Sequence, residues 1–254
     1  MNERFNFLGV KISVINFKKA LGRIASFSYQ QPAYICFPDA SVVTEANKNS
    51  QLKSILNNAF LTMPDGKPSQ LAARLQGYKD VTTVSGFHLC SALLETNMSH
   101  YFYGGDEDVL QKLKGTISKK YPVAKVLGYK SPPYLPLAEI EGNATIMNDI
   151  QQINLLKPDL VWVGISSPKQ DYLMFHYYKK LDRSLMLGVG GVFLYLADES
   201  LKSPEWMKKA GLRWLFRLMK EPGRLWPKYY GAFRFLMKNT GFFVGAFLGN
   251  KKNL

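Results

Sequence analysis

The sequence predicts an α/β protein whose mostly parallel sheet carries helices on both faces. Short apolar runs typical of buried strands alternate along the chain with longer segments that have helical apolar spacing. Such alternation indicates strand–helix–strand units and hence a parallel sheet. Turn residues, chiefly Gly, Pro, Ser and Asp, follow most of the apolar runs. Together these features predict an open α/β sheet, in which ligands bind at the carboxyl ends of the strands.

The elements can be placed in order along the first 200 residues. Residues 5–15 have period-two and β-branched character, which predicts one or two strands. The strands of the main sheet are expected at residues 33–37, 59–63, 101–103, 124–127, 159–163 and 185–187. The helices between them are expected at residues 17–27, 42–46, 51–58, 84–97, 106–120 and 140–155, with two more that begin near Lys67 and at Pro168.

The character of the chain changes from residue 203. One helical stripe carries Trp206, Ala210, Trp214, Leu215 and Leu218. After a break at 221–223, a second basic, aromatic helix carries Leu225, Trp226, Tyr229, Tyr230, Phe233, Leu236 and Met237. These rings either pack on the sheet or lie at a bilayer interface. Their mixture with Arg and Lys favours the interface for the second helix and for residues 241–248. We therefore expect an α/β domain at residues 1–200 and a membrane-docking helical appendage at residues 201–254.

The charge of the chain points to an anionic partner. The formal net charge is +14, and from residue 201 onward Lys and Arg outnumber Asp and Glu by twelve to two. Membrane lipid, a phosphorylated lipid and nucleic acid all fit such a tail. The apolar run at 242–248 favours lipid, because an arm that tracks nucleic acid has no use for it.

The location of the protein is also constrained by its sequence. Cys36 and Cys90 lie in apolar contexts and suggest no disulfide framework, so a reducing compartment is expected. The N-terminal residues lack the apolar core of a signal peptide. No apolar run approaches the ~20 residues that a membrane-spanning helix needs.

Two aspartates follow predicted strands of the sheet. Asp65 lies between the apolar run 59–63 and the helix that begins near Lys67, and Asp39 follows the strand at 33–37 in the same way. A carboxylate at this edge can act as a general base or bind a ligand hydroxyl. For Asp65, the alternative is that it only caps a helix or orders a turn.

Several other turns at the same edge are candidates for binding a ligand. Gly104-Gly105 lets the backbone approach a ligand closely, although Gly-Gly alone is a weak signal. Ser167 as N-cap and Pro168 as first helical residue would leave free N–H groups beside Lys169, which suits a diphosphate. The alternative is a well-capped helix with a solvated Lys169 and Gln170. His88 either supplies a polar contact or faces the core.

The motifs in this order resemble those of the bacterial TagA/WecG/CpsF glycosyltransferases, glycosyltransferase family 26. The resemblance spans nearly the whole chain and is carried by Pro64-Asp65-Gly66-Lys67-Pro68, Phe102-Tyr103-Gly104-Gly105, Gly128-Tyr129 with Ser131-Pro132-Pro133, and the runs 164–170, 188–191 and 211–218. It implies an inverting, metal-independent transfer of a sugar from a nucleotide-diphosphate donor, typically a UDP-sugar. The acceptor it implies is a polyprenyl-diphosphate-linked saccharide of cell-surface polysaccharide synthesis, reached at the anionic inner face of the bacterial cytoplasmic membrane. It implies a Rossmann-like α/β domain with a C-terminal helical appendage that docks on the membrane and closes over the site. It implies no cofactor and no nucleic-acid partner.

The resemblance also implies roles for individual residues. Asp65 matches the proposed catalytic base, and Arg217 and Arg224 match arginines that engage the acceptor or a diphosphate. The donor side is expected to comprise Asp39, Gly104, Gly105, Gly128, Tyr129, Ser167, Lys169, Gln170 and Gly190, and no residue is expected to bind a metal. Asp39 either binds donor hydroxyls or shares the role of base.

This sequence departs from the family pattern at three places. Phe37 and Asp39 replace a Thr-x-Asn-like pair, residues 83–88 lack an Arg and an Asp, and Leu194 stands where an Asp is frequent. The identity of the donor sugar and of the donor's nucleobase is therefore not inferred from the family for this chain. Two alternatives stay open, namely a basic α/β module that binds nucleotides or nucleic acid, and a family relative with a hydrolytic, scaffolding or otherwise non-transferring role.

Overall fold

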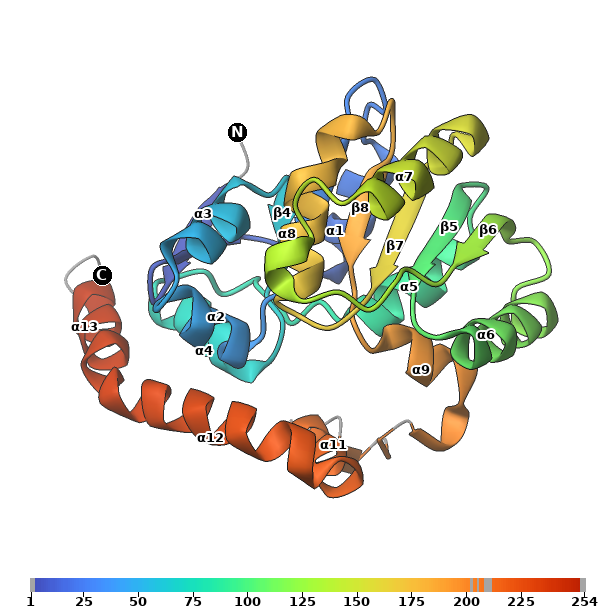
Figure 1. The fold of residues 1–254 in the computed structure, drawn as a ribbon. Coiled ribbons are helices and arrows are strands. Elements are labelled where there is room, and N and C mark those ends of the chain that lie inside the picture. Colours follow the sequence, from blue (N-terminus) through green and yellow to red (C-terminus); the bar gives the residue numbers. More distant parts are fainter. Residues whose placement is uncertain (1–2, 202, 205, 208–211, 252–254) are drawn as a thin grey trace.

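A six-stranded sheet, parallel throughout, forms the centre of the molecule (Figure 1). The structure is a computed structural model that describes residues 3–201, 203–204, 206–207 and 212–251. The strand order is β4-β3-β8-β7-β5-β6. The strands are β3 (Ala33–Cys36), β4 (Leu61–Thr62), β5 (Ser99–Gly104), β6 (Lys125–Lys130), β7 (Leu160–Gly164) and β8 (Leu185–Gly188). The prediction of an α/β fold with a parallel sheet is confirmed.

A separate antiparallel hairpin and the helices complete the fold. The hairpin consists of β1 (Arg4–Phe7) and β2 (Val10–Ser13), where one or two strands were expected. The helices are α1 (Phe17–Ala25), α2 (Ala40–Ala46), α3 (Ser50–Asn58), α4 (Lys67–Leu75), α5 (Gly86–Leu94), α6 (Glu107–Lys120), α7 (Ala144–Leu156), α8 (Lys169–Tyr177), α9 (Val192–Ala197), α11 (Arg213–Lys220), α12 (Pro222–Lys238) and α13 (Thr240–Lys251).

Successive side chains of a strand pack into two separate hydrophobic cores, one on each face of the sheet. In β5, Tyr101 and Tyr103 enter one core, whereas Phe102 enters the other. The first core is covered by α2, α3, α4, α7 and α8, and the second by α1, α5, α6 and α9. Successive side chains of a strand point to opposite faces of the sheet. Since helices cover both faces, each strand needs a continuous apolar run rather than one that alternates with polar residues.

The C-terminal helices α11, α12 and α13 pass along the carboxyl edge of the sheet. In Figure 1, α11 and α12 lie in the lower part of the view, below the arrowheads of β7 and β8, and α13 stands at the left edge. Helix α12 packs against α2, and α13 packs against α4. Within the described residues, no helix combines the length and the apolar character that crossing a membrane requires.

Several boundaries differ from those expected from the sequence. Strand β4 covers only Leu61–Thr62, and β6 extends to Lys130, beyond the expected end at 127. Helix α7 begins at Ala144 rather than at residue 140, because Asn143 caps it through the N–H groups of Thr145 and Ile146. The division of the chain at residue 200 stays a prediction.

Candidate active site

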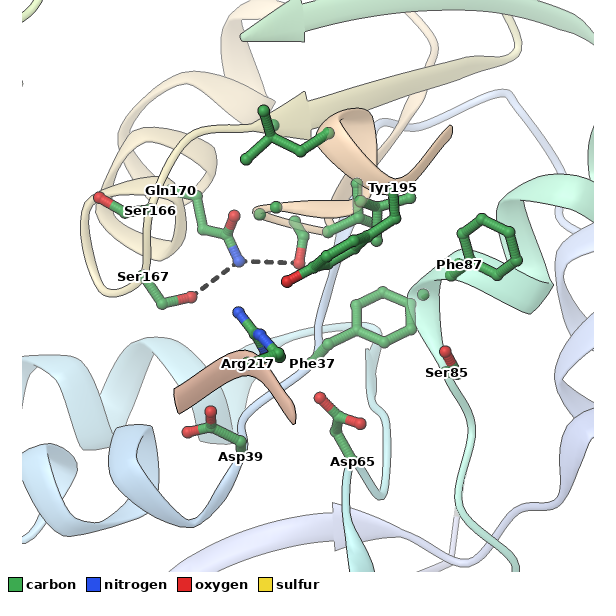
Figure 2. Close-up of a pocket in the computed structure, with 18 of the residues that line it drawn as sticks. Phe37, Asp39, Asp65, Ser85, Phe87, Ser166, Ser167, Gln170, Tyr195 and Arg217 are labelled. Atoms are coloured by element: carbon green, nitrogen blue, oxygen red, sulfur yellow. Dashed lines mark hydrogen bonds between the residues drawn. The ribbon is translucent and has the colours of Figure 1, made fainter. Parts of the chain in front are cut away.

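A cavity of about 390 Å³ lies where the carboxyl ends of β3, β4, β7 and β8 meet the C-terminal helices. Its floor is made by the turns that follow these four strands, and α11 and α12 contribute Phe216, Arg217, Glu221, Leu225, Lys228 and Tyr229. Figure 2 shows Gln170, Ser166 and Ser167 on one side, Phe37, Phe87 and Tyr195 on the other, and both aspartates beside Arg217. The sequence therefore places polar groups and aromatic rings around one hollow at the ligand-binding edge.

Asp65 lies on the turn between β4 and α4, as expected. It is half-buried and lines the cavity. It does not cap the helix, because the N-cap residue of α4 is Gly66, whose φ of 85° suits glycine. The hydroxyl of Ser69 donates to the backbone carbonyls of Asp65 and Gly66 and so helps to hold the turn. The turn thus places the Asp65 carboxylate at the cavity, and the N-cap position of α4 is occupied by Gly66 instead.

Asp39 lines the same cavity but also caps helix α2. Its Oδ1 accepts hydrogen bonds from the N–H groups of Ser41 (2.9 Å) and Val42 (3.0 Å), and from the Ser41 hydroxyl. One of its two oxygens therefore serves as a helix cap, a role that the sequence analysis did not expect of this residue. These hydrogen bonds hold the Asp39 carboxylate at the start of α2.

Arg217 brings a positive charge from α11 to the two aspartates. Burial lowers the pKa of its guanidinium, but the groups that face it raise the pKa above its ordinary value. The groups that raise it are Tyr195, Tyr229, Asp39 and Asp65. The guanidinium carbon lies 5.6 Å from the centre of the Tyr195 ring. Arg217 is therefore a permanent cation within the electrostatic reach of both carboxylates.

Gln170 and Ser167 form a buried hydrogen-bonded corner of the cavity. Gln170 is 3% exposed, and its Nε2 donates to Ser167 Oγ and to the Gly188 carbonyl, both at 2.8 Å (Figure 2). The expectation that Ser167 is the N-cap and Pro168 the first helical residue is wrong, because Pro168 occupies the N-cap position. The Ser167 hydroxyl instead accepts a hydrogen bond from the Gln170 side chain. Gly190, with φ 58°, lies beside this amide.

Two of the N–H groups at the start of α8, which were expected to be free, already have backbone partners. The N–H of Gln170 donates to the Ser166 carbonyl at 3.2 Å, and that of Asp171 to the Pro168 carbonyl at 2.9 Å. The Lys169 ammonium donates to the Leu135 carbonyl at 2.8 Å and lies 4.1 Å from the centre of the exposed Tyr134 ring. Lys169 therefore turns away from the cavity.

Lys169 and Gly105 line a second, adjacent hollow of about 500 Å³. This hollow and the cavity share the turn residues Gly164, Ile165 and Ser166. Gly104 has a different role from the one expected. A Cβ on Gly104 would lie 2.5 Å from the backbone of Gly164, so glycine is required there for the pairing of β5 with β7.

Two of the expected donor-side residues lie within a strand. Gly128 and Tyr129 belong to the edge strand β6 and line neither hollow. A Cβ on Gly128 would lie 2.4 Å from the Tyr101 ring, and the Tyr129 ring stacks on Phe102 with centroids 5.4 Å apart. The strand continues past residue 127, and these residues therefore pack against the neighbouring strand.

The structure also adds cavity residues that the sequence analysis did not single out. Lys228 and Tyr195 line the cavity, and neither belongs to a motif. Leu225 and Tyr229, which were expected at a bilayer interface, line the cavity instead. His88 is exposed at the cavity, so the alternative of a core-facing histidine is wrong. The side chain of Arg224 lies outside the described part of the structure.

Asp171 is a buried carboxylate next to this site. It is 2% exposed, and burial raises its pKa to about 6 although hydrogen bonds from Cys36 and Ser167 act to lower it. Across the described ranges, no group of three or more His, Cys, Asp or Glu residues is arranged to hold a metal ion.

Comparison with known proteins identifies relatives of one activity. The N-acetylglucosaminyldiphosphoundecaprenol N-acetyl-beta-D-mannosaminyltransferase of Bacillus subtilis (strain 168) is 24% identical over 196 residues, which cover 76% of this chain and 73% of that protein. The enzyme of the same name from Bacillus spizizenii is 23% identical over 210 residues, with 79% and 78% covered. That of Staphylococcus aureus (strain NCTC 8325 / PS 47) is 21% identical over 232 residues, with 87% and 88% covered.

The model of one protein family matches almost the complete sequence. This family is described as the glycosyl transferase WecG/TagA/CpsF family, and the match runs from residue 5 to residue 247. The matched range includes the turns of Asp65 and Gln170 and the helices α11 and α12 that close the cavity. The protein is therefore a glycosyltransferase and belongs to the WecG/TagA/CpsF family.

Proposed function

We propose that the protein transfers a sugar, with inversion, from a nucleotide-diphosphate donor to a polyprenyl-diphosphate-linked saccharide. The donor is a UDP-sugar, and the pathway is the synthesis of a cell-surface polysaccharide. The observation that carries the proposal is the single cavity in which Asp65 and Asp39 face Arg217. The relatives are named as N-acetylmannosaminyltransferases that act on N-acetylglucosaminyldiphosphoundecaprenol, which supports the class of acceptor.

Asp65 is the base in this proposal. An inverting transfer needs a carboxylate to take the proton of the acceptor hydroxyl while its oxygen attacks the anomeric carbon. Asp65 suits this role because it lines the cavity without capping α4. Asp39 is less suitable, because its Oδ1 already accepts three hydrogen bonds from Ser41 and Val42. Asp39 instead orients Arg217 or a donor hydroxyl.

Positive side chains stabilise the departing nucleoside diphosphate. As the glycosidic bond breaks, negative charge grows on the diphosphate oxygens, and preorganised cations lower the energy of that state. Arg217 and Lys228 reach the cavity from α11 and α12, and the guanidinium fork of Arg217 fits paired phosphate oxygens. The transfer therefore proceeds without a bound metal ion, and we expect full activity in the presence of EDTA.

The donor lies across the turn of Gly164, Ile165 and Ser166. This turn is shared by the two hollows, so a long ligand can occupy both. The nucleoside lies against the exposed Tyr134 ring, near Lys169 and Gly105, and the sugar lies in the cavity beside Gln170, Ser167 and Gly190.

The C-terminal helices dock on the anionic inner face of the cytoplasmic membrane. The outer face of α12 exposes a stripe made of Trp226, Tyr230, Phe233 and Met237, with exposed fractions of 51–61%. Arg234 and Lys238 flank this stripe and are themselves exposed. Aromatic rings with neighbouring cations suit the headgroup region of a bilayer. The opposite face of α12 lines the cavity, which brings the lipid-linked acceptor close to Asp65.

A transfer assay tests the proposal. Purified protein is incubated with anionic vesicles, N-acetylglucosamine linked through a diphosphate to a polyprenyl chain, and each of a panel of UDP- and GDP-sugars. Mass spectrometry of the lipid product identifies the donor. We expect one UDP-sugar to be transferred, and Asp65→Asn to lower kcat by roughly 10²–10⁴-fold, as the loss of a general base does.

Two outcomes would contradict the proposal. Normal turnover by Asp65→Asn would remove Asp65 from the role of base. Absence of transfer with every donor, together with release of free sugar or no reaction, would indicate a hydrolytic or scaffolding relative instead. Asp80→Asn is the matched control, because Asp80 is an exposed loop carboxylate that lines neither hollow, and we expect it to keep full turnover.

A further inference from the structure

One short segment, residues 131–135, forms the rim of the second hollow. It follows β6 directly, and all of its residues line the hollow. Two of them, Pro132 and Pro133, have ring-fixed φ angles that stiffen the segment. Tyr134, which comes next, is 92% exposed. A ring with so little burial gains little from packing, so the position of this rim depends on the bonds that hold its ends.

Side chains hold the rim at both ends. At the first end, the Ser131 hydroxyl donates to the Gly105 carbonyl at 2.7 Å, which joins the rim to the turn after β5. At the other end, the Lys169 ammonium donates to the Leu135 carbonyl at 2.8 Å, which joins the rim to the start of α8. The bond from Lys169 is the stronger kind, because its donor is ionised. The rim is thus tied to two turns that follow the neighbouring strands β5 and β7.

Lys169 also holds the Tyr134 ring. Its Nζ lies 4.1 Å from the centre of that ring, which is within the range of a cation–π contact. One ammonium group therefore contacts both the backbone at Leu135 and the aromatic side chain before it. Both contacts form without any ligand, so the ring is already oriented when the hollow is empty.

We propose that Lys169 is a positioning residue for the nucleoside of the donor. It ties the rim and so holds the Tyr134 ring at the hollow in advance, which lowers the entropic cost of binding. The inference rests on the proposed function, which puts the nucleoside against this ring. The role differs from that of a diphosphate cation, which the sequence suggested for this lysine. Lys169 acts through the rim and touches no reacting atom.

Ligands with different numbers of phosphates separate a tie from a diphosphate cation. Uridine, UMP and UDP are each used to displace a fluorescent UDP analogue from the full-length protein. If Lys169 ties the rim, Lys169→Met should weaken all three ligands by the same factor, roughly tenfold, as for one hydrogen bond from a charged group. A diphosphate cation would instead leave uridine unaffected and weaken UDP most. That second pattern would overturn the proposal.

Three further variants serve as controls. Lys169→Arg keeps a charged donor and should retain most of the affinity for all three ligands. Ser131→Ala removes the neutral tie at the other end of the rim and should weaken the three ligands by a smaller common factor. Lys179→Met removes an exposed lysine that lies 5.8 Å from the Tyr178 ring and lines neither hollow, so it should bind normally. Equal losses in Lys179→Met and Lys169→Met would reveal a general effect of charge and overturn the proposal.

Limited proteolysis tests the tie without any ligand. Chymotrypsin cleaves after accessible aromatic residues, and mass spectrometry identifies the fragment that ends at Tyr134. We expect this cut to be several-fold faster in Lys169→Met than in the wild type, because a released segment opens more readily to the protease. An unchanged rate would overturn the tie even if sugar transfer were observed. A faster cut, with no binding of any of the three ligands to the wild type, would retain the tie and reject the proposed UDP-sugar donor.

Discussion

Two aspartates, Asp39 and Asp65, follow neighbouring strands but differ in whether their carboxylates cap the next helix. Asp39 serves as N-cap of α2 through three hydrogen bonds on one oxygen, whereas Asp65 follows β4 without capping α4. A capping carboxylate stabilises the fold through the helix N-terminus, and a carboxylate that does not cap can be removed at little cost to stability. The two residues should therefore separate stability from catalysis.

We predict opposite consequences for substitutions of these two aspartates. Asp39→Ala should lower the free energy of unfolding by about 1 kcal/mol, the typical cost of a lost N-cap. Asp65→Asn should change it by less than about 0.5 kcal/mol, as most substitutions outside the core and caps do. Urea unfolding followed by circular dichroism gives both values. A larger loss in Asp65→Asn than in Asp39→Ala would reverse the assignment of cap and base.

The buried charge of Asp171 makes a prediction about stability against pH. Its pKa is about 6 in the folded protein and near 3.8 when exposed, so the folded state binds the proton more tightly between these values. The contribution of Asp171 to stability is therefore greatest below pH 4, and it falls as the pH rises to about 6. The fall amounts to roughly 3 kcal/mol, since one pKa unit corresponds to about 1.4 kcal/mol.

Asp171→Asn should thus unfold at a higher temperature than the wild type at pH 8, with little difference at pH 4. A lower unfolding temperature at pH 8 would show that the charge stabilises the fold.

The sequence identifies some site residues and misplaces others for physical reasons. Asp65, Gln170 and Gly190 follow strands directly, so their side of the sheet is set by the chain itself. Lys169 follows the same strand, yet its long side chain reaches the Leu135 carbonyl outside the cavity. Tyr195 and Lys228 carried no local signal, because they reach the cavity only through the packing of α9 and α12 against strand ends that are distant in sequence.

At the level of elements, the length of each strand decides which side chains reach the ligand-binding edge. The strands and helices that were predicted occur in the predicted order, because apolar periodicity is a local property. Helix α9 (Val192–Ala197) was not predicted. Strand ends were less predictable, because pairing with neighbours extends or shortens them. Strand β6 continues through Gly128 and Tyr129 by pairing with β5, and this pairing removes both residues from the site.

The close contact of β5 with β7 predicts a destabilising substitution. Gly104 has φ 139°, and a Cβ there would lie 2.5 Å from Gly164, so Gly104→Ala should destabilise the protein by about 2 kcal/mol or more. Gly115→Ala is the matched control, because Gly115 is in α6 with open space around its Cα and alanine is the better helix former. It should stabilise the protein by up to about 1 kcal/mol. Equal effects of the two substitutions on urea unfolding would contradict the packing role of Gly104.

At the scale of the whole molecule, one helix carries two different surfaces. The inward face of α12 presents Leu225, Lys228 and Tyr229 to the cavity, and its outward face presents the exposed aromatic stripe. The sequence predicted this aromatic helix and its basic residues. It could not assign the individual rings to the two faces, because that division depends on how α12 packs against α2.

The outward stripe predicts how the protein binds vesicles. Trp226→Ala combined with Phe233→Ala should weaken binding to anionic vesicles at least tenfold, since each exposed ring offers more than about 1 kcal/mol of apolar burial. Salt at 0.5 M or so should weaken binding of the wild type as well, because the net charge is +14. Leu155→Ala, which removes an exposed apolar side chain from α7, is the control and should bind normally in a vesicle sedimentation assay. Binding unchanged by the double substitution would reject the docking face.

The double role of α12 has a thermodynamic consequence. The same helix lines the cavity on one face and exposes the aromatic stripe on the other. Any shift of α12 therefore changes the binding of both the nucleotide and the membrane. Linkage then requires reciprocity: the factor by which vesicles change the affinity for the nucleotide equals the factor by which the nucleotide changes the affinity for vesicles. A protein that holds its donor more tightly on the membrane will also leave the membrane more slowly while the donor is bound, and release of the spent nucleotide will speed its departure.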